Sequence, residues 1–153
     1  MASIRRATAA DASAVVELIK ALAAHHGSTE FVRTDEDALL AAGFGEASDV
    51  GALVAEVDGA VAGFLSYTIR YSIWSGAHFM QIDDVFVRDE YRGDGLGATL
   101  MRESQRTCQE LGLSQIKWEV EPDNVAAIRF YERLGATGYD KRLFRWNIEE
   151  SAE

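Results

Sequence analysis

The sequence predicts an α/β fold in which a mixed, mostly antiparallel sheet is flanked by helices. Segments with apolar residues at helical spacing alternate along the chain with segments of strand periodicity, in the order β-α-α-β-β-β-α-β-α-β with room for one more strand. The 153 residues contain one proline and no Gly/Ser-rich linker, low-complexity tract or repeat. We therefore expect residues 1–153 to form a single domain with about six or seven strands and about four helices.

The first third of the chain predicts a strand and two helices. Residues 4–7 are expected to form a short strand. Thr8 and Asp11 follow at the spacing of a capping box, and apolar residues then recur at helical intervals as far as Gly27. The same capping spacing at 34–37 predicts the start of a second, shorter helix.

The middle of the chain predicts three strands. Residues 50–57 are nearly all apolar, which is typical of a strand buried on both faces. Asp58-Gly59 is a strong signal for a two-residue turn, so residues 61–71 should return as the antiparallel partner. A further strand is expected over 79–87.

The last third predicts two more helices and two more strands. An apolar stripe runs at helical spacing from Leu96 until Gly112. Apolar and charged residues alternate over 116–120, as in a strand, and the same alternation predicts a last strand over 144–148. Between these strands, Asn124 has the character of a helix cap, and Gly135 is expected to end the helix.

Composition excludes several classes of function. The net charge of −10 argues against nucleic acid as a partner, because phosphate backbones require a basic surface. It suits a cationic small substrate, although solubility alone explains it equally well. No apolar stretch approaches the roughly 20 residues that span a bilayer, and the first residues do not lead into a signal core. The single cysteine, Cys108, excludes an internal disulfide, and we expect a cytoplasmic protein.

The most informative segment joins the apolar strand ending at 87 to the helix that begins near 96. Gly93, Gly95 and Gly97 alternate within it, and Arg92 stands at its start. Glycines let a backbone approach a ligand closely, and the N-terminus of a helix attracts phosphate. The spacing fits neither the dinucleotide fingerprint nor the phosphate loop that ends in Lys-Ser/Thr. From the glycines alone, an ordinary strand-to-helix turn stays equally open.

The order of motifs adds a resemblance to a known family. The pattern [QR]-x-x-G-x-[GA], present as Arg92-Gly93-Asp94-Gly95-Leu96-Gly97, resembles the pyrophosphate loop of the GNAT N-acetyltransferases. Further segments are similar, in order, to the spermidine/spermine (diamine) acetyltransferases, and the likeness runs from about Ile4 to Trp146. The similar segments are 4–11, 18–23, 37–40, 43–46, 53–57, 83–87, 91–93 and 124–136. The resemblance implies the GNAT fold, acetyl-CoA as co-substrate and a homodimer. Where those relatives carry an acidic residue near the end of the first helix, this chain has His25-His26, and its segment 138–143 is shorter.

The resemblance also implies which residues bind acetyl-CoA. The backbone of 85–87 should bond the pantetheine arm as an added strand would, and the loop amides should take the diphosphate. Lys117, Trp118 and Glu119 should line the opposite strand, where the two strands must separate to admit the coenzyme. The alternative for Arg92 is a surface cation without a ligand, and the alternative for Asn124 is a helix cap that does not contact the coenzyme. The expected coenzyme contacts are Val85, Phe86, Val87, Arg92, Gly93, Asp94, Gly95, Leu96, Gly97, Ala98, Asn124 and Ala127.

Two adjacent acids are the candidates for handling the proton of an amine. An ammonium with a pKa near 10.4 costs about 4.6 kcal/mol to deprotonate at pH 7, so the proton needs a route out. Strand alternation predicts that Asp83 and Asp84 point to opposite faces. The resemblance makes Asp83 the general base or the acceptor of a water chain, and Asp84 a structural or substrate-orienting residue. Pairing with an arginine is the alternative for both.

Tyr131 is the candidate general acid for the departing thiolate. The resemblance and its seven-residue spacing from Asn124 support that role, whereas helical periodicity alone favours core packing. Glu119 and Trp74, together with the two acids, are expected to contact the acceptor, although Trp74 in a packed loop is equally open. No metal is expected, because His25 and His26 lack a third ligand at metal spacing.

These observations predict an acetyl-CoA-dependent N-acetyltransferase. The acceptor would be a primary amine of a small cationic molecule such as a diamine or polyamine, and the amine would attack directly in a ternary complex, because no residue has the character of an activated nucleophile. Acetylation of a lysine analogue or of a protein or peptide amine is the alternative within enzymes. A noncatalytic sensor of acetyl-CoA is the alternative from another class.

Overall fold

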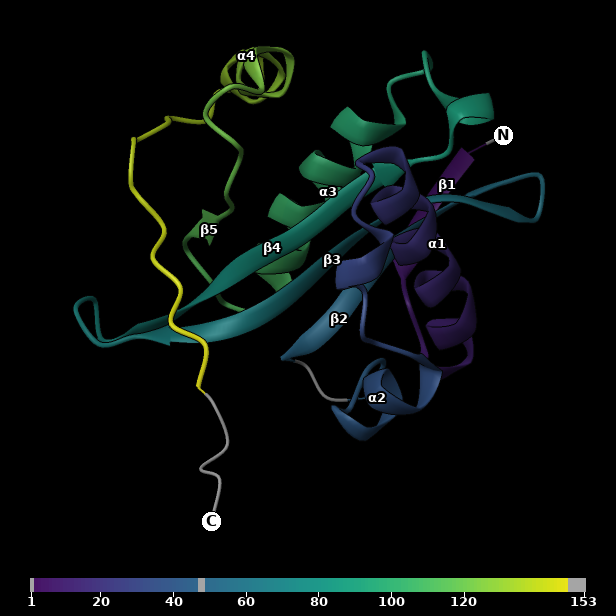
Figure 1. Ribbon diagram of the computed structural model, residues 1–153, viewed down its shortest axis with the longest axis horizontal. Coiled ribbons are helices and arrows are strands. Elements are labelled where there is room, and N and C mark those ends of the chain that lie inside the picture. Colours follow the sequence, from purple (N-terminus) through teal and green to yellow (C-terminus); the bar gives the residue numbers. More distant parts are fainter. Residues whose placement is uncertain (1, 47–48, 149–153) are drawn as a thin grey trace. The chain divides into compact units, whose positions relative to one another are not determined.

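The structure is a computed structural model that describes residues 2–46 and 49–148 (Figure 1). The chain divides into two compact units, Met1–Glu119 and Val120–Glu153. Among the described residues, the first unit contains the sheet, three α-helices and three short 3-10 helices, and the second contains one α-helix and the C-terminal segment. The two units are therefore considered separately.

The first unit is built on a five-stranded sheet in the order β1-β2-β3-β4-β5. Neighbours from β1 to β4 are antiparallel, and β5 lies parallel to β4, so the predicted mixed and mostly antiparallel sheet is confirmed. The described residues form five strands rather than six or seven. The strands are β1 (Ala2–Arg6), β2 (Val50–Val57), β3 (Ala60–Ser72), β4 (Ala77–Val87) and β5 (Ile116–Lys117).

Helices cover both faces of this sheet (Figure 1). The α-helices of the first unit are α1 (Ala12–His25), α2 (Glu36–Ala41) and α3 (Leu96–Glu110), and the short 3-10 helices are η1 (Ala9–Asp11), η2 (Thr29–Phe31) and η3 (Asp89–Tyr91). Val15 and Leu18 of α1 pack against Val54 and Phe64 on one face. On the other face, the Cys108 sulfur of α3 lies 3.8 Å from the Met80 sulfur.

Alternation along β2 explains how one strand serves both faces. Its residues from 51 to 55 are all buried, as the continuous apolar run predicts. Ala52 and Val54 belong to the cluster under α1, and the buried Leu53 lies between them in sequence. Asp58 and Gly59 both take positive φ angles, 51° and 84°, which confirms the predicted tight turn into β3.

Capping fixes where the first helical segment starts. The Thr8 backbone N–H donates to Asp11 Oδ2 at 2.7 Å, as the capping box predicts. The Arg5 guanidinium also bonds both Asp11 oxygens and reaches Glu56 Oε1, so β1, η1 and β2 are joined. For α2 the predicted cap was one residue early: Asp35, not Thr34, accepts the bond from the Ala38 N–H.

The second unit contains α4 (Val125–Arg133), which begins at the predicted cap. Asn124 Oδ1 accepts the Ala127 N–H at 3.2 Å. The strand predicted over 144–148 is wrong, since no ladder forms there within the described residues. The aromatic rings of Phe144 and Trp146 are 83% and 92% exposed, so their alternation does not reflect a buried face. Similarly, only Ile116–Lys117 of the predicted 116–120 strand pairs with the sheet.

Candidate active site

The outer edge of β4 is open along its second half. β4 pairs with β5 only through Met80 with Ile116 and Gln81 with Lys117. Within the described residues, no strand pairs with β4 on that side from Ile82 to Val87. The ladder between β4 and β5 thus ends after two residue pairs, and the prediction that the strands separate there to admit a coenzyme stays a prediction. An open strand edge offers backbone N–H and C=O groups to an extended ligand.

A β-bulge in β4 changes where its two acids lie. Ser66 of β3 is paired with Asp84 and Tyr67 with Ile82, so Asp83 is the extra residue in the ladder. Both acids line one cavity, and the bulge between them interrupts the strict alternation on which the prediction of opposite faces was based. A bulge interrupts strict alternation, and the hydrophobic pattern of a single strand does not reveal it.

This cavity has a volume of about 410 Å³ and lies in the first unit. One side is formed by α1 and the segment from η2 to α2, and the other by β2, β3 and the bulge of β4. Apolar side chains make most of its wall, and polar groups gather where β3 meets β4. It is lined by Val15, Ile19, Phe31, Val32, Arg33, Thr34, Leu39, Phe44, Val50, Gly51, Ser66, Tyr67, Thr68, Asp83 and Asp84.

The two acids differ in their surroundings. Asp83 is exposed at the cavity, and its pKa is raised by burial of part of the carboxyl and further by the Asp84 charge, against a lowering by Arg70. Asp84 is half-buried, and burial raises its pKa too. A hydrogen bond from Ser66 Oγ to Asp84 Oδ2 at 3.2 Å and the nearby His26 charge counteract that rise. Both carboxylates are thus stronger bases than a solvated aspartate.

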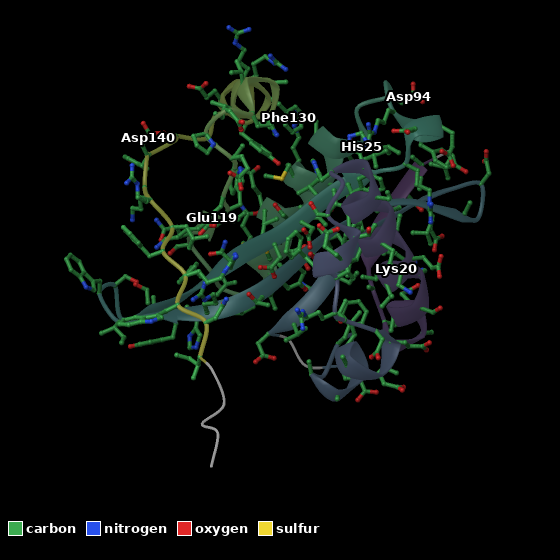
Figure 2. All side chains as sticks on the ribbon, viewed as in Figure 1. Lys20, His25, Asp94, Glu119, Phe130 and Asp140 are labelled. Atoms are coloured by element: carbon green, nitrogen blue, oxygen red, sulfur yellow. The ribbon has the colours of Figure 1, made fainter. Side chains whose placement is uncertain are left out.

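The loop after β4 combines glycines in left-handed conformation with backbone amides that have no acceptor within the helix. Gly93 and Gly95 have φ angles of 97° and 77°, and a side chain built on either would find no atom within 4 Å. Glycine is needed there for backbone conformation, and the surface above stays open. The helical ladder of α3 starts with the bond from the Thr99 N–H to the Gly95 carbonyl, so the amides of 96–98 precede it and have no acceptor within the helix. Figure 2 shows the Asp94 side chain directed outward from this loop.

Arg92 holds this loop to the end of β4. Its Nε donates to the Val87 carbonyl at 2.8 Å, and its Nη1 lies 2.9 Å from Asp89 Oδ1. The guanidinium also lies 5.4 Å from the centre of the Phe86 ring. Arg92 is therefore more than a free surface cation, and its charge stays beside the glycine loop.

Two predicted acceptor contacts lie apart from the cavity. Trp74 occupies the turn between β3 and β4 with its side chain fully exposed, and Glu119 is exposed beyond β5. Neither residue lines the cavity that holds Asp83 and Asp84. Trp74 lies in the turn that precedes Ala77, the first residue of β4, whereas the bulge lies at Asp83 farther along the strand.

Tyr131, Asn124 and Ala127 all belong to α4 in the second unit. Tyr131 is half-buried, with the Phe130 ring edge-on at 5.2 Å. Burial raises the pKa of its phenol, so the group is protonated at neutral pH. Asn124 acts as a cap, which leaves its predicted contact with the coenzyme as a separate possibility to test.

Several lining residues were not singled out from the sequence. Ser66 and Thr68 interrupt the apolar run of β3 at alternating positions, and that spacing places them on one face. Arg33 and Thr34 lie outside regular structure, so periodicity carried no signal for them. His26 acts on Asp84 by its charge although it does not line the cavity.

Within residues 2–46 and 49–148, no group of three or more histidine, cysteine, aspartate or glutamate side chains is arranged to hold a metal ion. None of the helices in these residues has the length and apolar character needed to traverse a bilayer.

Comparison with known proteins gives consistent relatives. Residues 12–136 match the Acetyltransferase (GNAT) family. The chain is 33% identical over 141 residues to a thialysine N-epsilon-acetyltransferase of Bos taurus, which covers 87% of this chain and 82% of that protein. It is 29% identical over 158 residues to the spermidine/spermine N(1)-acetyltransferase-like protein 1 of Homo sapiens, which covers 96% of this chain and 23% of that protein. An aminoglycoside N-acetyltransferase solved in complex with CoA has a similar fold, with a TM-score of 0.77, 21% identity, and coverage of 96% of this chain and 95% of that one.

Proposed function

This chain belongs to the GNAT acetyltransferase family, and from that premise we propose that it acetylates the primary amine of a small cationic acceptor such as a diamine or polyamine. Family membership confirms the resemblance predicted from the sequence and makes the protein an N-acetyltransferase that uses acetyl-CoA. The choice of acceptor and the roles of individual residues are inferred below from the site.

One observation carries this proposal. The open edge of β4 from Ile82 to Val87 starts at the two-acid bulge and leads to the glycine loop, so a single strand connects the cavity of the two acids to the loop proposed to bind the diphosphate. Acetyl transfer to an amine needs both features side by side. An extended pantetheine arm along this edge would span the distance between them.

The cavity suits a positively charged amine. Asp83 and Asp84 attract an ammonium group. Their raised pKa values also lie closer to the pKa of the amine, whose proton must leave. We assign Asp83 as the proton acceptor, directly or through a water, because it is the more open of the two. Asp84, which is bonded by Ser66, orients the acceptor.

The reaction proceeds by direct attack. The amine loses a proton to Asp83, its nitrogen bonds to the thioester carbonyl carbon, and the carbon–sulfur bond breaks. The sulfur of CoA takes a proton from the Tyr131 phenol, whose pKa burial raises further above neutral. The second proton of the amine nitrogen returns to Tyr131 through solvent, and Asp83 releases its proton to solvent, so both residues regain their starting states. The acetylated amine and CoA leave without an acetyl-enzyme.

The coenzyme contacts follow the same geometry. We propose that the backbone of 85–87 bonds the pantetheine arm, that the amides of 93–98 and Arg92 bind the diphosphate, and that Asn124 and Ala127 of α4 contact the arm. That residues 1–153 form a single domain, as predicted from the sequence, is part of this proposal. We further propose that the protein is cytoplasmic and works as a homodimer.

An acceptor screen tests this function. Purified protein with acetyl-CoA is assayed for free CoA release against diamines, polyamines, lysine analogues, aminoglycosides and peptides, alongside Asp83→Asn. We expect turnover with a small amine and a loss of about 100-fold or more in the variant. Turnover with peptides alone would contradict the small acceptor, and binding of acetyl-CoA with no amine acetylated would favour a sensor.

A further inference from the structure

Lys117 stands where the ladder between β4 and β5 ends. It pairs with Gln81 in the last register position before the open edge of β4 begins at Ile82. Gln81 pairs in turn with Thr68, which lines the cavity, so the three side chains form a row on one face of the sheet. Lys117 does not line the cavity itself, but it lies on the same face of the first unit, one strand farther along the row.

The side chain of Lys117 is exposed, and its contacts are weak. Its Nζ lies 4.5 Å from the centre of the Phe79 ring, and a cation over a ring at an exposed site is only weakly attracted. Among the described residues, Lys117 takes part in no ion pair. The amine can therefore leave the ring at little cost.

The amine of Lys117 can also approach the proposed place of acetyl transfer. Neighbouring strands lie about 4.8 Å apart and rise about 3.3 Å per residue, so the backbone of Lys117 lies roughly 8 Å from that of Asp83, two residues beyond Gln81. The flexible four-carbon stem of a lysine covers most of that separation. In the proposed reaction the thioester reacts at Asp83, so the amine and the acetyl group can meet within one chain.

We propose that Lys117 is a self-acetylation site, whose ε-amine attacks the acetyl-CoA held by the same chain when no other acceptor is present. This inference rests on the proposed function and extends it to an amine of the protein. The Lys117 ammonium gives a proton to Asp83, its nitrogen bonds to the carbonyl carbon, and the carbon–sulfur bond breaks. Overall, the lysine ammonium and acetyl-CoA become N-ε-acetyllysine, the thiol of CoA and one proton released to solvent.

The chain contains its own references for this reaction. Only three of its 15 basic residues are lysines, and an arginine keeps its proton, so its nitrogens are not nucleophiles. Lys20 is exposed on α1 and does not line the cavity (Figure 2). Lys141 is exposed in the second unit. Both report how fast a solvated lysine is acetylated without help.

Peptide mass spectrometry tests the site. Purified protein is treated with a lysine deacetylase, freed of that enzyme, and incubated with isotope-labelled acetyl-CoA and no added amine. We expect the label to appear at Lys117 about 10-fold or more faster than at Lys20 or Lys141, because a held donor raises the effective concentration. The rate should not depend on protein concentration, since donor and acceptor share one chain.

Two controls separate this reaction from ordinary chemical acetylation. Excess unlabelled CoA competes for the bound donor, so it should slow labelling of Lys117 and leave Lys20 and Lys141 unchanged. Asp83→Asn should slow labelling of Lys117 alone, by about 10-fold or more, because the proton acceptor is lost. Calorimetry should give this variant a Kd for CoA near the wild-type value.

Equal rates at the three lysines, or a Lys117 rate that neither CoA nor Asp83→Asn changes, would overturn the inference. A rate proportional to protein concentration would do so too, since the acetyl group would come from another copy. If small amines are acetylated while Lys117 stays unlabelled, the proposed function stands without this inference. If neither Lys117 nor any amine is acetylated, both fall.

Discussion

At the scale of single residues, the proposed proton-transfer roles rest on the surroundings of each group. Asp83 and Asp84 are raised in pKa and suit proton acceptance, whereas burial keeps Tyr131 protonated. The direction of the shift is the same in all three, but its consequence differs because a carboxylate begins charged at neutral pH and a phenol begins neutral. The proposed base, Asp83, and the proposed acid, Tyr131, are both partly buried, and they differ in role because one is a carboxylate and the other a phenol.

Removing the phenol hydroxyl should separate chemistry from binding. Tyr131→Phe is expected to lower kcat by about 100-fold or more, since the thiolate would depart without a proton donor, while the Kd for acetyl-CoA stays near the wild-type value. Steady-state kinetics and calorimetry measure the two. Tyr139→Phe, at a phenol that is 82% exposed on the same unit, is the control. Unchanged kcat in Tyr131→Phe would show that another group protonates the sulfur.

The buried charge of Asp84 should reduce stability at neutral pH. Its pKa is higher in the folded than in the unfolded protein, so the folded state disfavours the ionised form above the folded pKa, and this penalty is absent below the unfolded pKa of about 3.9. Asp84→Asn should therefore raise Tm at pH 7, with a difference from wild type that shrinks as pH falls towards 4.

Thermal melts across this pH range measure that difference. Asp140→Asn, at an exposed carboxylate, should leave Tm unchanged throughout. An Asp84→Asn variant that is less stable than wild type at pH 7 would mean that the Ser66 bond or another contact outweighs the cost of burial.

At the scale of elements, the strand-to-helix corner and the first capped turn each depend on few residues. The corner joins β4 to α3 through glycines in left-handed conformation, with Arg92 bonded to the Val87 carbonyl. The capped turn joins β1 to α1 through Arg5, Thr8 and Asp11. We propose that the first serves ligand binding, whereas the bonds of the second serve stability.

Gly95→Val tests the corner. The left-handed φ of 77° should cost a β-branched side chain about 1–2 kcal/mol, and the added side chain would also stand over the amides that take the diphosphate. Gly112→Val is closely matched, because Gly112 has a φ of 73° and equally open surroundings at the other end of α3. Both variants should lose similar stability, but only Gly95→Val should weaken CoA binding in calorimetry. Equal CoA affinity in the two would place the diphosphate elsewhere.

Asp11→Ala tests the capped turn. It removes the bond from the Thr8 N–H and both bonds from Arg5, so we expect a loss of about 1–2 kcal/mol in the free energy of unfolding. The Arg5 bonds lower the pKa of Asp11 to about 2, below its unfolded value, so this contribution is complete above about pH 4 and is lost as pH falls towards 2. Urea unfolding at pH 7 and pH 3 measures it. A loss that does not shrink at the lower pH would contradict the ionic part of the interaction.

At the scale of the whole molecule, local patterns predicted most elements but not the site that they form. Residues 50–57 and the Asp58-Gly59 turn were predictable because burial on both faces and turn chemistry are local properties. The bulge at Asp83 depends on the register between β3 and β4, which no single strand specifies. The cavity assembles residues as distant as Val15 and Asp84, so its volume and its Arg33 could only come from the fold.

The predicted strand at 144–148 shows that a local pattern can also predict an element that does not form. The alternation of Phe144, Trp146 and Ile148 has strand periodicity, yet the described residues give it no partner. Periodicity indicates a strand only where one face is buried. The same reasoning explains β5, where only Ile116–Lys117 has a partner and the rest of the predicted strand leaves the sheet beside the open edge of β4.

The central claim is that one strand edge positions the coenzyme between its diphosphate loop and the two-acid cavity, and a crystal structure with bound CoA tests it most directly. We predict diphosphate oxygens within hydrogen-bonding distance of the amides from Gly93 to Ala98, the pantetheine arm along Ile82 to Val87, and the sulfur at the cavity of Asp83. CoA bound away from this edge, or a strand paired with β4 where the arm should lie, would contradict the account.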